Sequence, residues 1–427
     1  MLRSSAHVFF VIIAILTSFC LNAQSLYDQA LLNRQQFAHT SANFAITNVQ
    51  WMNAPVPLYG KLEMSFTLDG TWTNPFDPAD IEVVANIRLP NNQLITVPCF
   101  YMIPYSPQNG VTQLQGSVLY DQTGSGKWCL RFGPTQTGLT KVYLRATRPS
   151  TGQTTTSPWY SYTVVDQGDK GYIQTAPNAN YFQHMGDQSL FFGTGPNIAW
   201  TRSEDQLPGG PIPSYDYYFG QTAGHITSTR IWMCHYAWLE WMPLVGASSS
   251  NSWSGYAGLN YYNQMVASAF DRIFEMAEAQ DLKVMLTLDD NDEHLTSAGT
   301  SHWEYSPYSQ VNGGPCSLPG DTWGSSAART AYKNRLRYIF ARWGYSQSLW
   351  ALNSWNDTGG GTPSSDVISW HQTMQDQVDS LSAAVRPIFY GSNFKHEIQD
   401  IVDYAQCISG GVVAGKPNVR QECYYSD

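Results

Sequence analysis

The sequence predicts a multi-domain protein in which an antiparallel, immunoglobulin-like β-sandwich is followed by a (β/α)8 barrel of the TIM type. Length is the first reason, because 427 residues exceed what one hydrophobic core usually supports. The second is that residues from Gly60 to Val165 form short strand-like runs separated by turn residues. The third is that strand-like and helical runs alternate after Asp166, as expected of a parallel sheet with crossover helices.

The N-terminus predicts export. Arg3 is followed by an apolar run from Val8 to Phe19 and then by a small-residue cleavage pattern, Leu21-Asn22-Ala23. We therefore expect residues 1–23 to be a signal peptide and the mature chain to begin near Gln24. Since the run is shorter than the roughly 20 apolar residues of a membrane-spanning helix, a secreted or periplasmic protein without a membrane span is expected.

Composition favours a carbohydrate ligand. Aromatic residues make up 14% of the chain and charged residues only 13%. The C–H face of a sugar ring stacks on aromatic rings, so carbohydrate-active proteins are rich in Trp and Tyr, although a large aromatic core would explain part of the same excess. A net charge of −10 without a run of Lys and Arg argues against nucleic acid or an anionic membrane as partner. The oligomeric state stays open.

The sandwich domain is expected to span residues 40–166. Its predicted strands are rich in β-branched and aromatic residues with partial alternation, and they are Leu62 to Leu68, Ile81 to Leu89, Gln93 to Tyr101, Lys127 to Phe132, Leu139 to Thr147 and Trp159 to Val165. Cys99 and Cys129 fall in two of these strands, so they form a disulfide or remain buried thiols. The cysteine spacing gives no zinc pattern, and no cofactor is expected.

The barrel domain is expected to span residues 171–427. Its predicted strands are Leu190 to Ala199, Ser228 to Cys234, Lys283 to Asp289, Leu349 to Trp355, Arg386 to Gly391, Asp400 to Gln406 and Pro417 to Gln421. Apolar residues at helical spacing predict helices over Tyr262 to Ala279, Ala327 to Trp343 and Val367 to Ala384. The tract from Cys407 to Lys416 is too short for a crossover helix. We therefore expect either a barrel truncated at its C-terminus, with at most seven strands, or wrongly assigned last strands.

The run from Leu349 to Asp357 fits a buried strand that ends in the amide of Asn356 and the carboxylate of Asp357. In a (β/α)8 barrel the active site lies at the C-terminal ends of the strands. Retaining glycosidases need two carboxyl groups about 5–5.5 Å apart, and a hydrogen bond to the sugar 2-OH strengthens in their transition state. Alternatively, Asn356 and Asp357 cap the glycine-rich turn that follows.

Several longer runs are specific enough to indicate a family. They are Tyr59 to Glu63, Asn74 to Pro78, Val97 to Phe100, Phe191 to Trp200, Asn312 to Pro315, Leu336 to Tyr345 and Trp355 to Asp357, and they span nearly the whole mature chain. These runs resemble a group of bacterial glycoside hydrolases of the clan A, family 5-like (cellulase- or mannanase-like) barrel type, which carry an N-terminal sandwich of unassigned function. The resemblance implies that Asp357 is the acid/base, at a position where the group has Glu, and that Glu422, after Lys416-Pro417, is the nucleophile.

The resemblance has departures that bear on activity. Asp in place of Glu retracts the carboxyl of residue 357 by one methylene, and a misplacement near 1 Å can lower a rate about 10²-fold. Arg420 and Gln421 are polar where the group has apolar residues. The alternative to an enzyme is therefore a secreted, glycan-binding pseudoenzyme, and a further one is that the sandwich mediates protein–protein or cell-surface attachment.

Other strand-end residues are candidate substrate-binding groups. Arg230 matches the second-strand Arg of the group and would hydrogen-bond the nucleophile, or else form a structural ion pair. Three residues after the third predicted strand bind sugar hydroxyls or form an acidic loop on a solvated face: Asp289, Asp290 and His294. Four residues are sugar contacts or pack in the core or rim: Trp200, Trp232, His235 and Trp303. The predicted function is retaining hydrolysis of O-glycosidic bonds in a β-linked oligo- or polysaccharide.

Overall fold

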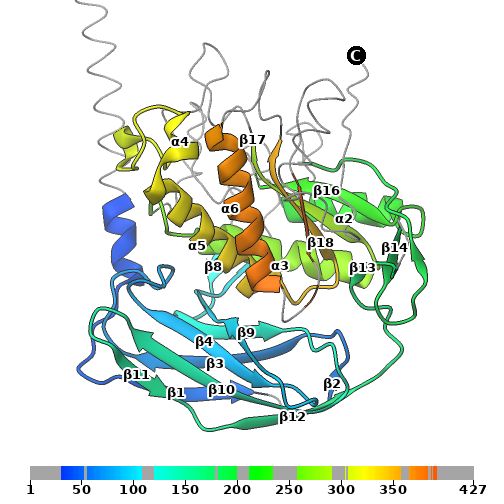
Figure 1. Cartoon of the computed structure of the whole chain (residues 1–427), viewed down its shortest axis with the longest axis horizontal. Helices are drawn as coiled ribbons and strands as arrows, with labels where there is room; N and C mark the ends of the chain where they lie inside the picture. The colour runs from blue at the N-terminus through cyan, green and yellow to red at the C-terminus, as the bar shows by residue number, and fades with distance from the viewer. Residues whose placement is uncertain are drawn as a thin grey trace, which may run out of the picture.

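The computed structural model describes residues 30–51, 55–107, 120–177, 181–199, 211–233, 257–290, 303, 306–356, 365–382, 386 and 388–391. These residues form a two-sheet β-sandwich and an α/β unit with a parallel sheet, and the sandwich lies below the α/β unit in Figure 1. Among the helices in these ranges, none is both long enough and apolar enough to cross a membrane.

Two sheets form the sandwich. The first has the order β1-β3-β9-β6, with β1 at Ala45–Trp51, β3 at Leu62–Asp69, β9 at Lys127–Phe132 and β6 at Phe100–Met102. The second has the order β2-β12-β10-β4-β5, with β2 at Val56–Pro57, β12 at Tyr160–Val165, β10 at Gly138–Arg148, β4 at Glu82–Arg88 and β5 at Leu94–Pro98. β11 (Gln153–Thr156) pairs with β10. Alternate side chains of each inner face fill the core between the sheets.

Five of the predicted sandwich strands are confirmed within a residue or two, as β3, β4, β9, β10 and β12. The run Gln93 to Tyr101 is not one strand, because β5 pairs with β4 in one sheet and β6 pairs with β9 in the other. Of the two alternatives for Cys99 and Cys129, a disulfide or buried thiols, the structure shows buried, free thiols. Cys129 stands opposite Phe100 in the ladder, so Cys99 is one residue out of register with it.

The α/β unit contains a parallel sheet of order β16-β17-β18-β19. These strands are Ser228–Trp232, Lys283–Asp290, Leu349–Asn356 and Phe389–Gly391, and they confirm four of the predicted strands. The predicted helices are confirmed as α3 (Gln264–Ala279), α5 (Ser326–Trp343) and α6 (Ser365–Ser382), each of which connects two neighbouring strands. Two helices were not predicted, α2 (Pro211–Thr222) and α4 (Asp321–Gly324).

The first predicted barrel strand needs correction. Leu190 and Phe191 form β15, which pairs antiparallel with β14 (Phe182–His184), and β14 pairs with β13 (Ile173–Thr175). Only the end of the predicted run lies along the parallel sheet, where Asn197 bridges Arg230 and the Trp232 amide donates to Ala199 O at 3.0 Å. The strands predicted over 400–406 and 417–421 lie outside the described residues, so the part described is a four-stranded parallel sheet rather than a closed barrel.

Local sequence explains the helix boundaries. The Asn263 side chain accepts from the backbone amides of Met265 and Val266, and so caps α3. The Ser325 hydroxyl caps α5 in the same way, through the amide of Ala328. β18 is buried along its whole length, as expected of a central strand covered on both faces.

Helices α3 and α5 contact the sandwich, and the contact is partly ionic. Arg131 of β9 donates to Glu63 at 2.6 Å and to Asp271 of α3 at 2.7 Å. Arg342 of α5 donates to the other oxygen of Asp271 at 2.7 Å. Phe76 packs its ring against Tyr262 and Tyr338 beside this network. The two parts of the molecule therefore share one continuous core.

Candidate functional site

The C-terminal ends of β16, β17 and β18 bring polar side chains together. Because parallel strands end at the same edge of a sheet, residues in register there become neighbours. Trp232 pairs with Thr287, Thr287 pairs with Asn353, and Asp290 pairs with Asn356. This edge is where the sequence predicted an active site.

Arg230 is the centre of the cluster. Its side chain is buried, with 2% of the residue exposed. Nε donates to Thr287 Oγ1 at 2.8 Å, Nη2 donates to Asn356 Oδ1 at 2.9 Å, and the guanidinium lies 4.7 Å from the centre of the Trp232 ring. Thr287, Asn356 and the Trp232 ring thus orient the guanidinium.

Thr287 and Asn353 belong to the cluster although neither was predicted from the sequence. Thr287 Oγ1 also accepts from Asn353 Nδ2 at 3.4 Å, and Asn353 Oδ1 is buried without a hydrogen-bond partner among the described residues. A buried carbonyl oxygen without a donor is costly. The signal for Asn353 was present, since it is a polar residue inside a strand that is otherwise mostly apolar.

Asp289, two residues after Thr287 on β17, forms an ion pair with a helix. Its carboxylate accepts from Arg335 Nη1 of α5 at 2.8 Å, and both side chains are nearly fully buried. Burial raises the pKa of the Asp289 carboxyl, while the Arg335 guanidinium acts to lower it. Arg335 Nη2 also donates to Leu288 O at 2.6 Å. The structure therefore places Asp289 against a helix, and its side chain is not part of a solvated loop.

The aromatic candidates that the structure describes are buried. Trp232 is 2% exposed and Trp303 is 7% exposed, and both belong to the hydrophobic core. Trp355 of β18 packs against Trp323 of α4 and Trp370 of α6, which anchors the end of this strand to the helices behind it.

His371 of α6 lies behind β18 as well, with Nδ1 3.4 Å from Ser354 Oγ. Burial lowers the pKa of His371 to about 3, so the imidazole is neutral at physiological pH. A neutral ring suits a position within the packing between helix and sheet, where an imidazolium charge would be costly.

The structure thus brings Arg230, Trp232 and Asn356 together, pairs Asp289 with Arg335 and buries Trp303 in the hydrophobic core. Asp290 is in register with Asn356. The remaining predicted site residues lie outside the described residues, and they are Trp200, His235, His294, Asp357 and Glu422. Asp357 directly follows Asn356 in the chain.

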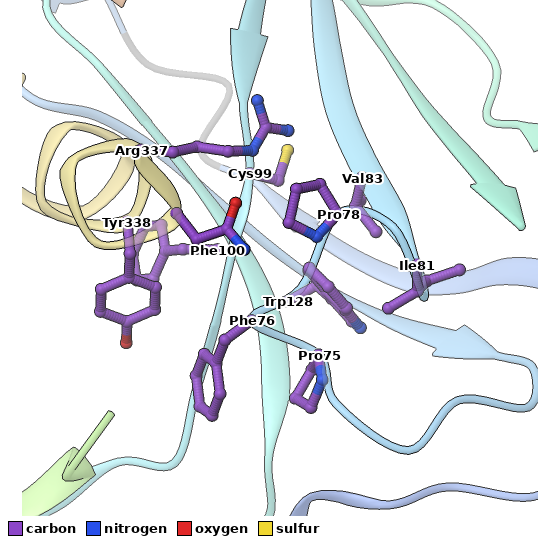
Figure 2. Close-up of a pocket in the computed structure, with 11 residues that line it drawn as sticks. Pro75, Phe76, Pro78, Ile81, Val83, Cys99, Phe100, Trp128, Arg337 and Tyr338 are labelled. Atoms are coloured by element: carbon purple, nitrogen blue, oxygen red, sulfur yellow. The ribbon is translucent and has the colours of Figure 1, made fainter. Parts of the chain in front are cut away.

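A small cavity lies elsewhere, between the sandwich and α5 (Figure 2). It is lined by Phe100 and Trp128 on one side and by Arg337 and Tyr338 on the other. Its volume of about 20 Å³ is room for a single water molecule. It is too small for a sugar ring, so it does not compete with the strand ends as a substrate site.

A solved structure from Bacteroides vulgatus, provisionally assigned as a glycoside hydrolase, matches 80% of this chain and 56% of that chain, with a TM-score of 0.50 and 12% sequence identity. In fold, this chain resembles a glycoside hydrolase. It spans little more than half of the length of that protein. No family model matches the sequence, and no curated protein does.

Two further similar structures have lower TM-scores. A family 2 glycosyl hydrolase from Bacteroides cellulosilyticus has a TM-score of 0.33 at 10% identity, over 85% of this chain and 38% of that one. An endoglucanase from Pseudomonas stutzeri has a TM-score of 0.27 at 15% identity, over 47% of this chain and 51% of that one.

Proposed function

We propose that this chain is an exported glycoside hydrolase that cleaves a β-linked glycan with retention of configuration. The observation that supports the proposal best is the buried Arg230 guanidinium at the ends of three parallel strands, oriented by Thr287 and Asn356. Asn356 ends β18, and Asp357 is the next residue in the chain. The likeness in fold to a Bacteroides vulgatus protein assigned as a glycoside hydrolase agrees with this proposal.

In this proposal Glu422 attacks the anomeric carbon, and Asp357 protonates the leaving oxygen and then accepts a proton from the incoming water. Arg230 stabilises the Glu422 carboxylate in its ionised form. Asn356 Oδ1 accepts from Arg230 Nη2, and in this proposal Asn356 Nδ2 donates to the sugar 2-OH. No metal or organic cofactor has a role in these steps.

The proposal includes the organisation expected from the sequence: a signal peptide over 1–23, a sandwich domain over 40–166 and a barrel domain over 171–427 of which the four parallel strands are part. Export to the periplasm or the medium would place the enzyme where polysaccharide is encountered. An endoglucanase- or mannanase-like specificity is the finer expectation, from the family resemblance.

The test compares the parent with Glu422→Gln, Asp357→Glu and Asp357→Asn on a panel of aryl β-glycosides and on β-glucan and β-mannan. Glu422→Gln should lower kcat on all substrates by at least about 10³-fold, because it removes the nucleophile. Asp357→Glu should raise activity on the natural linkages, because the carboxyl regains its reach, and Asp357→Asn should spare only glycosides with good leaving groups. Glu275→Gln, an exposed carboxyl on α3, is the matched control.

Two results would contradict the proposal. Turnover by the parent that survives Glu422→Gln would remove the double displacement. Absence of turnover in both the parent and Asp357→Glu, with glycan binding retained, would favour the glycan-binding pseudoenzyme, for which the shortened acid at position 357 is the specific indication.

A further inference from the structure

The outer face of the second sandwich sheet lies on the side of the sandwich away from α3 and α5. The other sheet faces these helices through Arg131 of β9, whereas β12 of this sheet runs along the lower edge of the molecule in Figure 1. Val142 and Leu144 of β10 point into the core, so their neighbours Lys141, Tyr143 and Arg145 point outward.

Aromatic rings lie on this outer face. Trp159, just before β12, is 46% exposed, and its ring centre lies 4.5 Å from that of Tyr143. The Arg88 guanidinium lies 5.6 Å from the Trp159 ring centre. A large ring held in place at the surface by a second ring offers a flat apolar platform without a further loss of conformational freedom.

The same face carries three basic side chains, those of Arg88, Lys141 and Arg145. Lys141 and Arg88 are exposed and stand directly opposite each other in the β10–β4 ladder, and Arg145 is four residues after Lys141 on β10. Like charges in directly opposed positions destabilise a sheet. None of the three makes an ion pair within the described part of the chain, and Glu82 lies at the far end of β4, opposite Thr147. The chain as a whole has a net charge of −10, so a group of basic side chains on one face contrasts with the rest of the protein.

The Asn86 side-chain amide lies beneath this face with one hydrogen-bond donor unsatisfied among the described residues. Asn86 stands opposite Tyr143 on one side and Thr96 on the other, and its Oδ1 accepts from Thr96 Oγ1 at 3.1 Å. Asn86 is only 4% exposed, and its Nδ2 has no acceptor among the described residues. A buried donor without an acceptor costs free energy unless a ligand or an ordered water supplies one.

We propose that this face binds an anionic polysaccharide whose sugar units carry carboxylates, that is, a polyuronate. A pyranose ring stacks its C–H face on Trp159, and a uronate carboxylate lies between Arg88 and Lys141, where it offsets their mutual repulsion. An anion without sugar rings would not use the aromatic pair, and a neutral glycan would not use the cations. The proposal goes beyond the hydrolytic function, because it assigns a second glycan contact to the sandwich.

The test uses the full chain and measures binding by affinity electrophoresis and titration calorimetry. The probes are polygalacturonate, alginate, fully methyl-esterified polygalacturonate and single-stranded DNA. We expect binding to at least one of the two polyuronates, weaker binding to the methyl ester, which has the same backbone without its charge, and weakening of polyuronate binding by salt.

The variants separate the two halves of the site. Trp159→Ala should weaken polyuronate binding about tenfold through loss of the stacked ring. The double variant Arg88→Gln/Lys141→Gln should weaken it further and remove most of its salt dependence. Tyr217→Ala removes an exposed ring from an aromatic pair on α2, and Arg272→Gln removes an exposed charge from α3, so both should bind like the parent.

Failure of both polyuronates to bind would overturn the proposal, as would equal affinity for single-stranded DNA or unchanged affinity in both the Trp159 and the Arg88/Lys141 variants. The variants lie on exposed positions, and an unchanged thermal unfolding midpoint checks that each has folded. Binding is measured independently of turnover, so loss of binding leaves the catalytic proposal untouched, and loss of activity in Glu422→Gln leaves this one untouched.

Discussion

Replacing Asp271 by asparagine should lower the free energy of unfolding by about 3–5 kcal/mol, because it leaves the buried Arg342 guanidinium without its carboxylate and the buried Arg131 guanidinium with Glu63 alone. Asp271 accepts from Arg131 Nη1 at 2.7 Å, from Arg342 Nη2 at 2.7 Å and from Trp343 Nε1 at 2.7 Å. The Arg131 and Arg342 side chains are 7% and 0% exposed, so water cannot replace the lost partner at either of them. Asparagine keeps the volume, which excludes a cavity as the cause.

The measurement is urea-induced unfolding followed by tryptophan fluorescence and circular dichroism, and the control lies one helical turn away. Glu275 on the same helix pairs with Arg272 at 3.5 Å, and these side chains are 46% and 53% exposed. An exposed pair of this kind contributes at most about 1 kcal/mol, so Glu275→Gln should leave the transition nearly unchanged. A loss in Asp271→Asn within about 1 kcal/mol of that in Glu275→Gln would refute the reasoning.

The same carboxylate predicts a pH dependence. Although burial alone would raise the pKa of Asp271, the guanidinium groups of Arg131 and Arg342 hold it well below its usual range. A carboxyl with a depressed pKa contributes stability that is complete above the pKa of the unfolded chain, about 3.9, and is lost as the pH falls below it. The difference between parent and Asp271→Asn should therefore be constant from about pH 7 to pH 5 and shrink below about pH 4. A difference that grows on acidification would contradict the ion-pair explanation.

The remaining predictions concern the α/β unit and the thiols. Burial lowers the pKa of His371 to about 3, so below about pH 6.5 the unfolded chain binds a proton at this residue that the folded chain does not. The free energy of unfolding should therefore fall by about 1.4 kcal/mol for each pH unit below that point. This dependence on pH should be shallower in His371→Gln. Burial raises the pKa of Cys129 to about 12 and also raises the pKa of Cys99, so neither thiol should react with Ellman's reagent until the protein is unfolded; rapid labelling of the native chain at either position would contradict this. Arg230→Lys keeps the charge but not the fork that reaches Thr287 and Asn356, so kcat/KM on an aryl β-glycoside should fall at least about tenfold, and unchanged kinetics would remove Arg230 from the site.

Much of the sandwich follows from local pattern. β3 and β9 were predicted within one residue, because alternation between buried and exposed positions is a property of each strand alone. The run Gln93 to Tyr101 has the same composition throughout, yet the chain leaves one sheet after Pro98 and enters the other at Phe100. Which sheet a strand joins depends on its partners, β4 and β9, and these are distant in sequence. Composition therefore predicts the strand and not its sheet.

The candidate site was also only partly predictable from the sequence. Arg230 and Asn356 were predicted separately, as residues near the ends of two strands, and the long Arg230 side chain reaches Asn356 Oδ1 at 2.9 Å. Thr287 was missed because a threonine inside a strand is common, and only the neighbouring guanidinium distinguishes it. Asp289 was expected near the cleft because it ends a strand, but the strand end places its carboxylate against Arg335 of α5. A strand end predicts the edge of the sheet on which a residue lies, and contacts decide which way its side chain turns.

Buried arginines already pair with two aspartates of the α/β unit. Arg131 and Arg342 share Asp271, and Arg335 pairs with Asp289, so two aspartates of the α/β unit already neutralise cations within the fold. The guanidinium groups hold the pKa of Asp271 below its usual range, so its carboxyl is a poor proton donor, and the Asp289 carboxylate accepts from Arg335 of α5. In the proposed mechanism the acid/base and the nucleophile are instead Asp357 and Glu422, the residues that the family resemblance implies. Arg230 Nη2 donates to Asn356 Oδ1, and Asp357 is the next residue in the chain. Loss of the Arg230 contact should consequently disturb the acid/base step first, so Arg230→Lys should impair substrates with poor leaving groups more than activated aryl glycosides.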